Sequence, residues 1–364
     1  MDGATTASHS EAMEKAMEKS LGGAEFAPRT TYLDTAAFGL LPTRAVTAMR
    51  TAVDRAAEGR YHGGYEAAEV SRATYARLAG VPVARVAVGA SVAVYAGLIA
   101  ASLPSGAEVL VAEGDFSSLV NPFHVRPGLT VRSAPLDALA EAVRPSTALV
   151  AVSAAQSATG AITDLRAVRE AARAHGARTL VDASQSAGWL PLDAGDFDFT
   201  VCTARKWLLC PSGVAFLTVP EDFGGLTAVF AGMFAGEVPA NSNYGAVELA
   251  RSARRFDESP AVYSYVAARH ALALVEELGP ETIHAHDAAL ADRFRAGAAG
   301  LGHEPLPAPG SPIVSVPGLG HAAERLAEAG FQLSSRAGNL RASFHLYNTS
   351  DDVDRLLEAL PDHR

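Results

Sequence analysis

Short apolar runs alternate with helix-length segments along most of this chain, from residue 31 to about residue 247. Turn residues bound the apolar runs, and residues 165–175 are one of the helical segments between them. Strands joined in this way are typical of a parallel sheet, because a parallel neighbour needs a long crossover connection. The pattern therefore predicts an α/β fold whose large domain has a mostly parallel sheet. The strand ends of such a sheet converge on one ligand-binding edge.

The pattern changes after residue 256. Two helical stretches, residues 261–278 and 281–301, precede a proline-rich loop, short strands and a last helix at residues 351–360. These segments predict a smaller α+β domain. We expect residues 1–28 to be an N-terminal arm or flexible tail with a short helix at residues 11–19, residues 29–250 to form the large domain, and residues 251–364 the small C-terminal domain.

Asp182 and Lys206 each stand at the polar end of an apolar run. Residues 178–182 read as a buried strand that ends in the carboxylate, and the run from residue 197 delivers the lysine just past its apolar part. Singly, the aspartate reads as a helix cap and the lysine as a solvated charge. Jointly they offer what pyridoxal phosphate needs, since an acid can hold a pyridine nitrogen protonated and an amine can form a Schiff base. The pair predicts a site for that cofactor.

The lysine must lose its proton near neutral pH to act as a base. Its ordinary pKa is about 10.4, so burial or a neighbouring cation has to lower that pKa. Arg205, the preceding residue, or the cofactor ring itself can supply the cation. A carboxylate in a poorly solvated pocket favours the charged pyridinium by direct attraction.

Three segments, residues 181–188, 203–207 and 211–213, resemble the cofactor region of class V aminotransferase-type enzymes of fold type I. That superfamily includes cysteine desulfurases, kynureninase, isopenicillin N epimerase and the C–S lyase of ergothioneine biosynthesis. The resemblance extends from Tyr32 to the C-terminus. It implies that Asp182 pairs with the pyridine nitrogen, Gln185 with the ring phenolate oxygen, and Lys206 with the aldehyde carbon.

Phosphate ligands are expected around two strand ends. Residues 85–91 read as a strand entering a helix at Ala90 and Ser91, and such a helix start binds phosphate, although a simple helix cap explains the same residues. Thr203 resembles the phosphate ligand of the family. Ser259 resembles the position from which a partner subunit reaches the phosphate, which implies a homodimer; a turn before Pro260 is the alternative.

Phe116 follows another apolar strand, where the resemblance implies an aromatic residue or histidine stacked on the cofactor ring. A core phenylalanine is the alternative. Because Phe116 cannot carry a proton, acid–base work falls to Lys206. Ser157 lies in a loop that resembles the substrate-facing region. Arg341 is the best residue for holding the substrate carboxylate, since a guanidinium matches a carboxylate in bidentate geometry, with a surface arginine as the alternative.

Composition agrees with an ordinary soluble enzyme, which we expect in the cytoplasm; the amino acid substrate is implied by the cofactor and the resemblance. Hydrophobic residues make up 49% of the 364 residues, and the formal net charge is −10. This charge disfavours nucleic acid and anionic membranes as partners. We expect no membrane span and no secretion signal, because no apolar stretch reaches the required length.

The two cysteines bear on the reaction. A cysteine desulfurase needs a mobile thiol shortly before the carboxylate-binding arginine, and residues 333–341 contain none. Cys202 reads as a buried small hydrophobe, while Cys210 in a loop is either buried or reactive. Persulfide chemistry and metal binding are both disfavoured, and we expect no metal site.

Two reactions and one non-catalytic role fit these residues. In a C–S lyase, Lys206 removes the α-proton of a cysteine conjugate or sulfoxide and the β-sulfur group leaves; residues 63–69 and 205–208 look similar to the ergothioneine C–S lyase. In an aminotransferase, the same lysine moves the proton to the cofactor and a 2-oxo acid is released. A cofactor-binding scaffold without activity is the third reading, which the joint presence of Asp182, Gln185, Lys206 and Arg341 disfavours.

Overall fold

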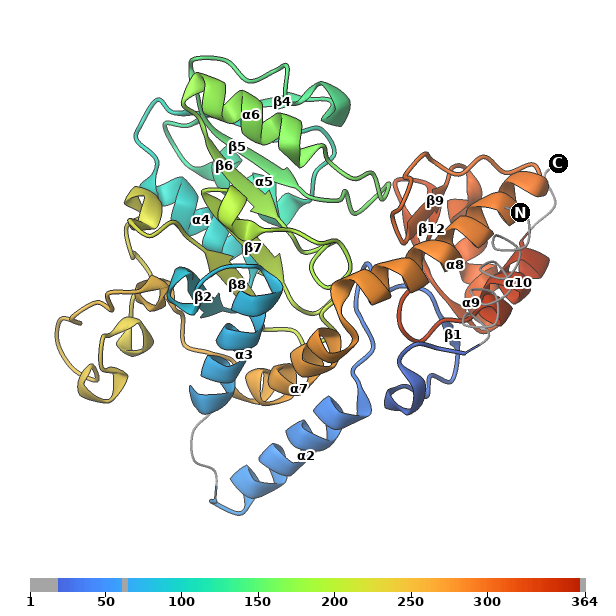
Figure 1. The fold of residues 1–364 in the computed structure, drawn as a ribbon, viewed down its shortest axis with the longest axis horizontal. Coiled ribbons are helices and arrows are strands. Elements are labelled where there is room, and N and C mark those ends of the chain that lie inside the picture. The colour runs from blue at the N-terminus through green and yellow to red at the C-terminus, as the bar shows by residue number, and fades with distance from the viewer. Residues whose placement is uncertain (1–18, 61–64, 361–364) are drawn as a thin grey trace, which may run out of the picture.

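The structure, a computed structural model, describes residues 19–60 and 65–360. A large lobe and a smaller one are joined by long helices (Figure 1). The large lobe contains a seven-stranded sheet. Its strands, in spatial order, are β2 (Val86–Gly89), β8 (Ala215–Thr218), β7 (Phe199–Thr203), β6 (Arg178–Asp182), β5 (Thr147–Ser153), β3 (Glu108–Ala112) and β4 (Thr130–Ala134).

Five neighbouring strands pair in parallel and β2 runs in the same direction, which confirms the predicted α/β class and mostly parallel sheet. Strand β8 is antiparallel to both of its neighbours, β7 and β2. The connection from β7 to β8 is only residues 204–214, which is too short for a helical crossover, so β8 has to run back along β7. Ser153 and Asp182, the last residues of β5 and β6, lie side by side in the register, and Asp182 pairs with Val201, two residues before the end of β7, so the three strands end at the same edge of the sheet.

Helices cover the sheet on both faces. Helices α4 (Val92–Ser102) and α5 (Ser117–Val125) pack on one face, and α6 (Leu165–His175), α3 (Tyr65–Leu78) and α7 (Val262–Leu278) pack on the other. Helix α2 (Thr43–Ala57) lies outside α7. Helix α6 has the predicted bounds because Asp164 caps its start and Gly176 ends it in a left-handed conformation. Helix α7 packs against α2 and α3. The division of the chain at residue 250 stays a prediction.

The small lobe is built on α8 (Pro280–Gly300) and a three-stranded antiparallel sheet in the order β11 (Ser334–Arg336), β12 (Asn339–Ser343) and β9 (Ile313–Val316). Helices α9 (Ala323–Glu328) and α10 (Ser350–Ala359) complete it. The N-terminal strand β1 (Thr31–Tyr32) pairs with β10 (Phe331–Gln332), so the chain's first strand belongs to this lobe. Strand β12 stops at Ser343 because the side chain of Asn348 accepts a hydrogen bond from the His345 amide and closes a turn.

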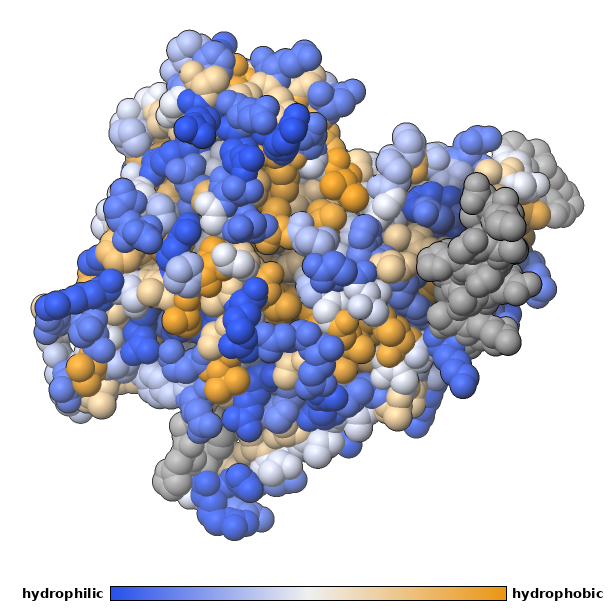
Figure 2. Space-filling model, viewed as in Figure 1, coloured by the Kyte–Doolittle hydropathy of each residue, from blue (hydrophilic) through white to orange (hydrophobic). Residues whose placement is uncertain are grey.

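The helix predicted at residues 11–19 lies almost entirely outside the described residues. Residues 19–26 approach the small lobe: the Gly22 amide donates to the Leu346 carbonyl at 2.8 Å, and Phe26 contacts Tyr347 edge to face. Within the described part of the chain, every helix is too short or too polar to cross a bilayer. On the face shown in Figure 2, hydrophilic residues cover most of the outer rim and hydrophobic atoms gather in the middle, between the lobes.

Candidate active site

Lys206 lies three residues past the end of β7, in the interior between the lobes, and its side chain is only 3% exposed. Burial lowers the pKa of its ammonium group to about 8, and the positive charges of Arg205 and Arg341 lower it further, while Asp182 opposes the shift. Its Nζ atom stands 4.9 Å from the centre of the Phe116 ring. Lys206 is therefore a lysine that is readily neutral at mildly basic pH.

Asp182 ends β6 and is buried beside the lysine's strand. Its Oδ1 atom accepts a hydrogen bond from the Ser184 amide at 2.9 Å. Burial raises the pKa of this carboxyl, and Ser184 and the charge of Lys206 partly offset the rise. Within residues 19–60 and 65–360, neither Asp182 nor Lys206 takes part in an ion pair. Two buried groups of opposite charge thus face a common region without touching.

Gln185 is held by two tryptophan-bearing segments and the N-terminal segment. Its Oε1 accepts from the Trp207 indole at 2.8 Å, which fixes the orientation of the amide. Its Nε2 donates to the Ala36 carbonyl at 2.9 Å and to the Ser157 hydroxyl at 2.8 Å. The backbone carbonyl of Gln185 accepts from the Trp189 indole. Gln185 therefore points a donor group toward Ser157, the residue expected to face substrate.

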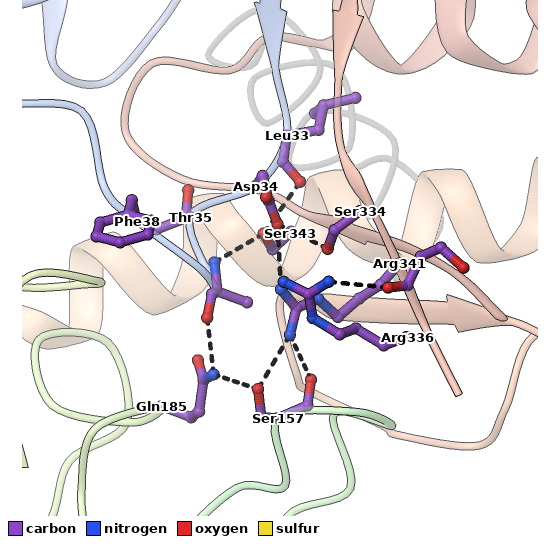
Figure 3. A network of polar contacts seen from close by, with 12 residues as sticks. Leu33, Asp34, Thr35, Phe38, Ser157, Gln185, Ser334, Arg336, Arg341 and Ser343 are labelled. Carbon is purple, nitrogen blue, oxygen red and sulfur yellow. Dashed lines mark hydrogen bonds and ion pairs between the residues drawn. The ribbon is translucent and has the colours of Figure 1, made fainter. Parts of the chain in front are cut away.

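Arg341 is fully buried on β12, so the reading of a surface arginine is wrong. Its Nη1 donates to the Ser157 carbonyl at 2.7 Å and hydroxyl at 3.0 Å, and its Nη2 donates to Asp34 Oδ1 at 3.1 Å (Figure 3). Its Nε is buried and has no partner in the described residues. Burial lowers the pKa of the guanidinium, against the pull of Asp34. The Nε–H group of Arg341 is thus left without an acceptor among the described residues.

Asp34 is a site residue that the sequence analysis missed. It follows β1 and also accepts a hydrogen bond from the Ser334 hydroxyl at 2.9 Å (Figure 3). The signal was present, because the run Tyr32-Leu33-Asp34 ends in a carboxylate as the run before Asp182 does. Only the folded chain shows that Asp34 meets Arg341, which is 307 residues away.

The expected phosphate region lies at the junction of β2 and α4. Ser91 caps α4, accepting a hydrogen bond from the Val94 amide at 3.4 Å, as predicted. The Ala90 amide donates to Glu258 Oε2 at 2.9 Å, so a phosphate at this amide has to replace a carboxylate. Thr203 is half-buried, and its amide donates to the Ser184 hydroxyl. Ser259 is exposed, and its role toward a partner subunit stays a prediction.

Phe116 precedes α5 with its ring 38% exposed, which does not fit the alternative of a core phenylalanine. The Asp115 carboxylate holds Phe116 in place through hydrogen bonds. It accepts from the Phe116 amide at 2.7 Å and from the amide and hydroxyl of Ser153 at 2.8 and 2.5 Å. Burial raises the pKa of the Asp115 carboxyl. The aromatic face beside Lys206 is therefore tied to the end of β5.

A buried histidine–aspartate pair supports the lysine segment and was also missed. His345 Nδ1 lies 2.7 Å from Asp287 Oδ2, and its Nε2 lies 3.1 Å from the carbonyl oxygen of Trp207. Both side chains are fully buried. The sequence offered no signal, since Asp287 belongs to a helical run and His345 lies 58 residues further along the chain. The pair links α8 to the residue that follows Lys206.

Both cysteines are closed off from solvent. Cys202 and Cys210 are each 1% exposed, and burial raises the pKa of both thiols. The reading of Cys210 as a reactive loop thiol is therefore unsupported, because reactivity needs an accessible thiolate. The chain has no other cysteine.

Pyridoxal phosphate fits the residues that surround Lys206. The buried carboxylate of Asp182 lacks a cation in contact, which a pyridinium nitrogen provides, and Phe116 offers an aromatic face near the lysine amine. The unpartnered Nε of Arg341 suits a substrate carboxylate next to Ser157. Asp182, Gln185, Phe116 and Lys206 would hold the cofactor, and these individual roles stay predictions. Among the described residues, no group of three potential metal ligands is found.

Comparisons with known proteins agree with this geometry. The model of the family described as aminotransferase class-V matches residues 31–306. An uncharacterized aminotransferase of Bacillus subtilis is 29% identical over 61% of this chain and 62% of its own length. Isopenicillin N epimerase of Streptomyces clavuligerus is 29% identical over 80% of this chain and 83% of its own. A probable cysteine desulfurase of Synechocystis is 27% identical over 59% of this chain and 56% of its own.

Solved structures share the fold. A cystine C–S lyase superposes with a TM-score of 0.83 at 24% identity, covering 92% of this chain and 98% of its own. A cysteine desulfurase from Thermococcus onnurineus superposes with a TM-score of 0.79 at 21% identity, covering 90% and 93%. These likenesses confirm the predicted fold type I architecture.

Proposed function

We propose that this chain, which belongs to the aminotransferase class-V family, is a C–S lyase that catalyses β-elimination on a cysteine conjugate or sulfoxide. Family and fold make the chain a pyridoxal-phosphate-dependent enzyme, as predicted from Asp182 and Lys206. The reaction within the family rests on one observation, namely a buried lysine of lowered pKa in a chain whose two thiols are both buried with raised pKa values.

The inaccessible thiols disfavour a desulfurase. A persulfide forms only when a cysteine attacks the sulfur of the substrate, and both cysteines here are buried with raised pKa values. Chemistry at the substrate carbon–sulfur bond is then left to base-catalysed elimination, which needs no nucleophile beyond the cofactor-bearing lysine. The printed name of the cystine C–S lyase, whose fold this chain shares, is in keeping with that chemistry.

The proposed division of labour follows from the geometry. When bound, pyridoxal phosphate accepts the electrons released at the α-carbon of an amino acid. Arg341 holds the substrate carboxylate through its unpartnered Nε–H group, while Asp34 and Ser157 keep the guanidinium in place. Lys206 takes the α-proton, for which its pKa of about 8 is well placed. Asp182 stabilises positive charge at the far side of the site.

The second candidate is an aminotransferase, favoured by the relative of that name in Bacillus subtilis. Lys206 and Arg341 serve that reaction equally well. The two reactions differ in their products, because elimination releases ammonia in every cycle, whereas transamination stops after one turnover without a 2-oxo acid.

The test supplies cysteine conjugates and common amino donors without a 2-oxo acid acceptor. We expect sustained release of ammonia and pyruvate from the conjugates, and a single turnover that converts the cofactor to its amine form would favour the aminotransferase instead. Lys206→Ala should abolish turnover with the fold intact by circular dichroism. Borohydride should bleach the yellow cofactor and label Lys206; a protein that shows no such label is a scaffold rather than an enzyme.

The Asp182→Asn variant tests the role of Asp182, which with Lys206 predicts the cofactor site. We expect kcat to fall by about a hundredfold or more, since a neutral amide no longer stabilises a protonated ring nitrogen. Asp198→Asn is the matched control, because Asp198 sits on the neighbouring connection and binds only Thr179. Equal losses in both variants would show that Asp182 acts through the fold alone.

A further inference from the structure

Arg205 carries a guanidinium group for which the described residues provide no counterion. The residue directly precedes Lys206, and its backbone carbonyl accepts a hydrogen bond from the Gly39 amide at 2.8 Å. The guanidinium carbon lies 4.8 Å from the centre of the Phe38 ring. Its Nε atom is buried without a hydrogen-bond partner, and no carboxylate in the described ranges forms an ion pair with it.

The contrast with Arg341 is informative. Both arginines lie close enough to Lys206 to lower its pKa. Arg341 is paired with Asp34 and held by Ser157, whereas Arg205 meets only an aromatic face. A partly buried charge without a counterion is costly, and an anion that enters the site offsets that cost. Of the two arginines, Arg205 is therefore the one that no carboxylate of the described residues neutralises.

We propose that Arg205 binds a second anionic group on the side chain of the substrate, so that the preferred substrates are amino acids with an anionic tail beyond the sulfur. This inference rests on the proposed elimination. Stacking on Phe38 occupies one face of the guanidinium and leaves its N–H edges free, and those edges match a carboxylate in bidentate geometry. Phe38 is itself 51% exposed, so the pair reaches from beside Lys206 to the surface of the protein.

The role of Arg205 is binding, and the reaction needs no further reagent. In the elimination, the carbon–sulfur bond of the conjugate breaks, the thiol leaves with its electron pair and a proton, and water converts the remaining fragment to pyruvate and ammonia. Nothing is oxidised or reduced. The anionic tail stays on the departing thiol.

Two nearly isosteric substrates isolate the charge: S-carboxymethyl-cysteine, whose tail is a carboxylate, and S-carbamoylmethyl-cysteine, whose tail is a neutral amide. For Arg205→Met we expect the ratio of kcat/KM on the carboxylate to kcat/KM on the amide to fall by about tenfold or more, mainly through KM on the carboxylate, because a change in the pKa of Lys206 acts on both substrates alike. Arg205→Lys should lie between, because it keeps the charge and loses the fork. Arg77→Met is the control, since Arg77 pairs with Glu276 on the surface.

Other outcomes overturn the inference. An equal loss on both substrates would mean that Arg205 acts on the α-carboxylate or on the pKa of Lys206 and not on the tail, and a weakened dissociation constant for pyridoxal phosphate, measured by titration of its absorbance, would place it at the cofactor phosphate. If neither substrate turns over, the proposed elimination fails. The dissociation constants of the two compounds, read from the cofactor's absorbance change in wild type and Arg205→Met, still decide whether Arg205 selects the anionic tail.

Discussion

At the scale of single residues, the lowered pKa of Lys206 has a kinetic consequence. Only the neutral amine attacks the aldehyde of the cofactor, and a lysine with a pKa of about 8 is roughly a tenth neutral at pH 7. We expect the rate of cofactor capture by the cofactor-free protein to rise about tenfold per pH unit below pH 8 and to level off above it. Stopped-flow absorbance measures this rate.

The Arg205→Met variant tests whether a neighbouring positive charge contributes to the lowered pKa of Lys206. Arg205 lowers the pKa of Lys206, so removing its charge raises that pKa and moves the inflection to higher pH. Arg77→Met should leave the inflection where it is. An inflection near the ordinary lysine value of about 10.4 in the wild-type protein would contradict the burial of Lys206.

Gly39 sets the distance between the N-terminal segment and the lysine segment. A Cβ atom at this position would lie 2.1 Å from the carbonyl oxygen of Lys206, which is backbone and cannot turn aside. Gly39→Ala should therefore move the lysine and lower kcat by at least about tenfold. Gly97→Ala in α4 is the matched control, since a Cβ there meets nothing within 4 Å. A helical Gly→Ala change should be neutral or stabilise the protein slightly.

At the scale of elements, the pair of His345 and Asp287 connects α8 and the turn after β12 to the segment that carries Lys206. His345→Phe leaves a buried carboxylate and the Trp207 carbonyl without partners, and we expect the free energy of unfolding to fall by about 3–5 kcal/mol. Urea denaturation of the cofactor-free protein measures this change.

The double variant separates pairing from packing. Asp287→Leu together with His345→Phe removes both partners, so the double variant should lose less stability than His345→Phe alone. Additive losses would mean that the two side chains do not act as a pair.

At the scale of the whole molecule, a homodimer is the expected assembly. The segment between β8 and α7 exposes large apolar side chains: Val229 and Phe230 are about half exposed, and Tyr244 is 95% exposed. Apolar residues gathered in this way are typical of a protein interface. Light scattering should give twice the chain mass of 37.7 kDa. Tyr244→Glu should then weaken the assembly, and a wild-type mass of one chain would contradict the prediction.

Much of the architecture was legible in the sequence. The strand ends at Asp182 and Lys206 could be found because buried parallel strands read as apolar runs and their polar ends stand out. Arg341 could be placed on a strand by alternation, but its full burial could not be foreseen. That burial depends on Asp34, which arrives from the N-terminal segment and pairs with it across the small lobe.

Asp287 and Glu258 could not be predicted from the sequence, for a common physical reason. Asp287 sits in an ordinary amphipathic helix, and Glu258 follows a short turn, so neither differs locally from a solvated acid. What distinguishes them is the partner brought by the fold, a histidine in one case and the Ala90 amide just before α4 in the other. Periodicity reports which face of an element is buried, and it carries no information on which distant side chain is met there.

The sealed cysteines matter for an enzyme that handles sulfur. A lyase of the proposed kind sheds thiols or sulfenic acids beside its own catalytic machinery, and an accessible thiolate there would be captured as a mixed disulfide. Cys202 lies inside the sheet and Cys210 lies beneath α7, so the protein exposes no thiol that its products could modify. We expect the enzyme to stay active in the presence of the sulfur compounds that it releases, and treatment with iodoacetamide should leave its activity unchanged.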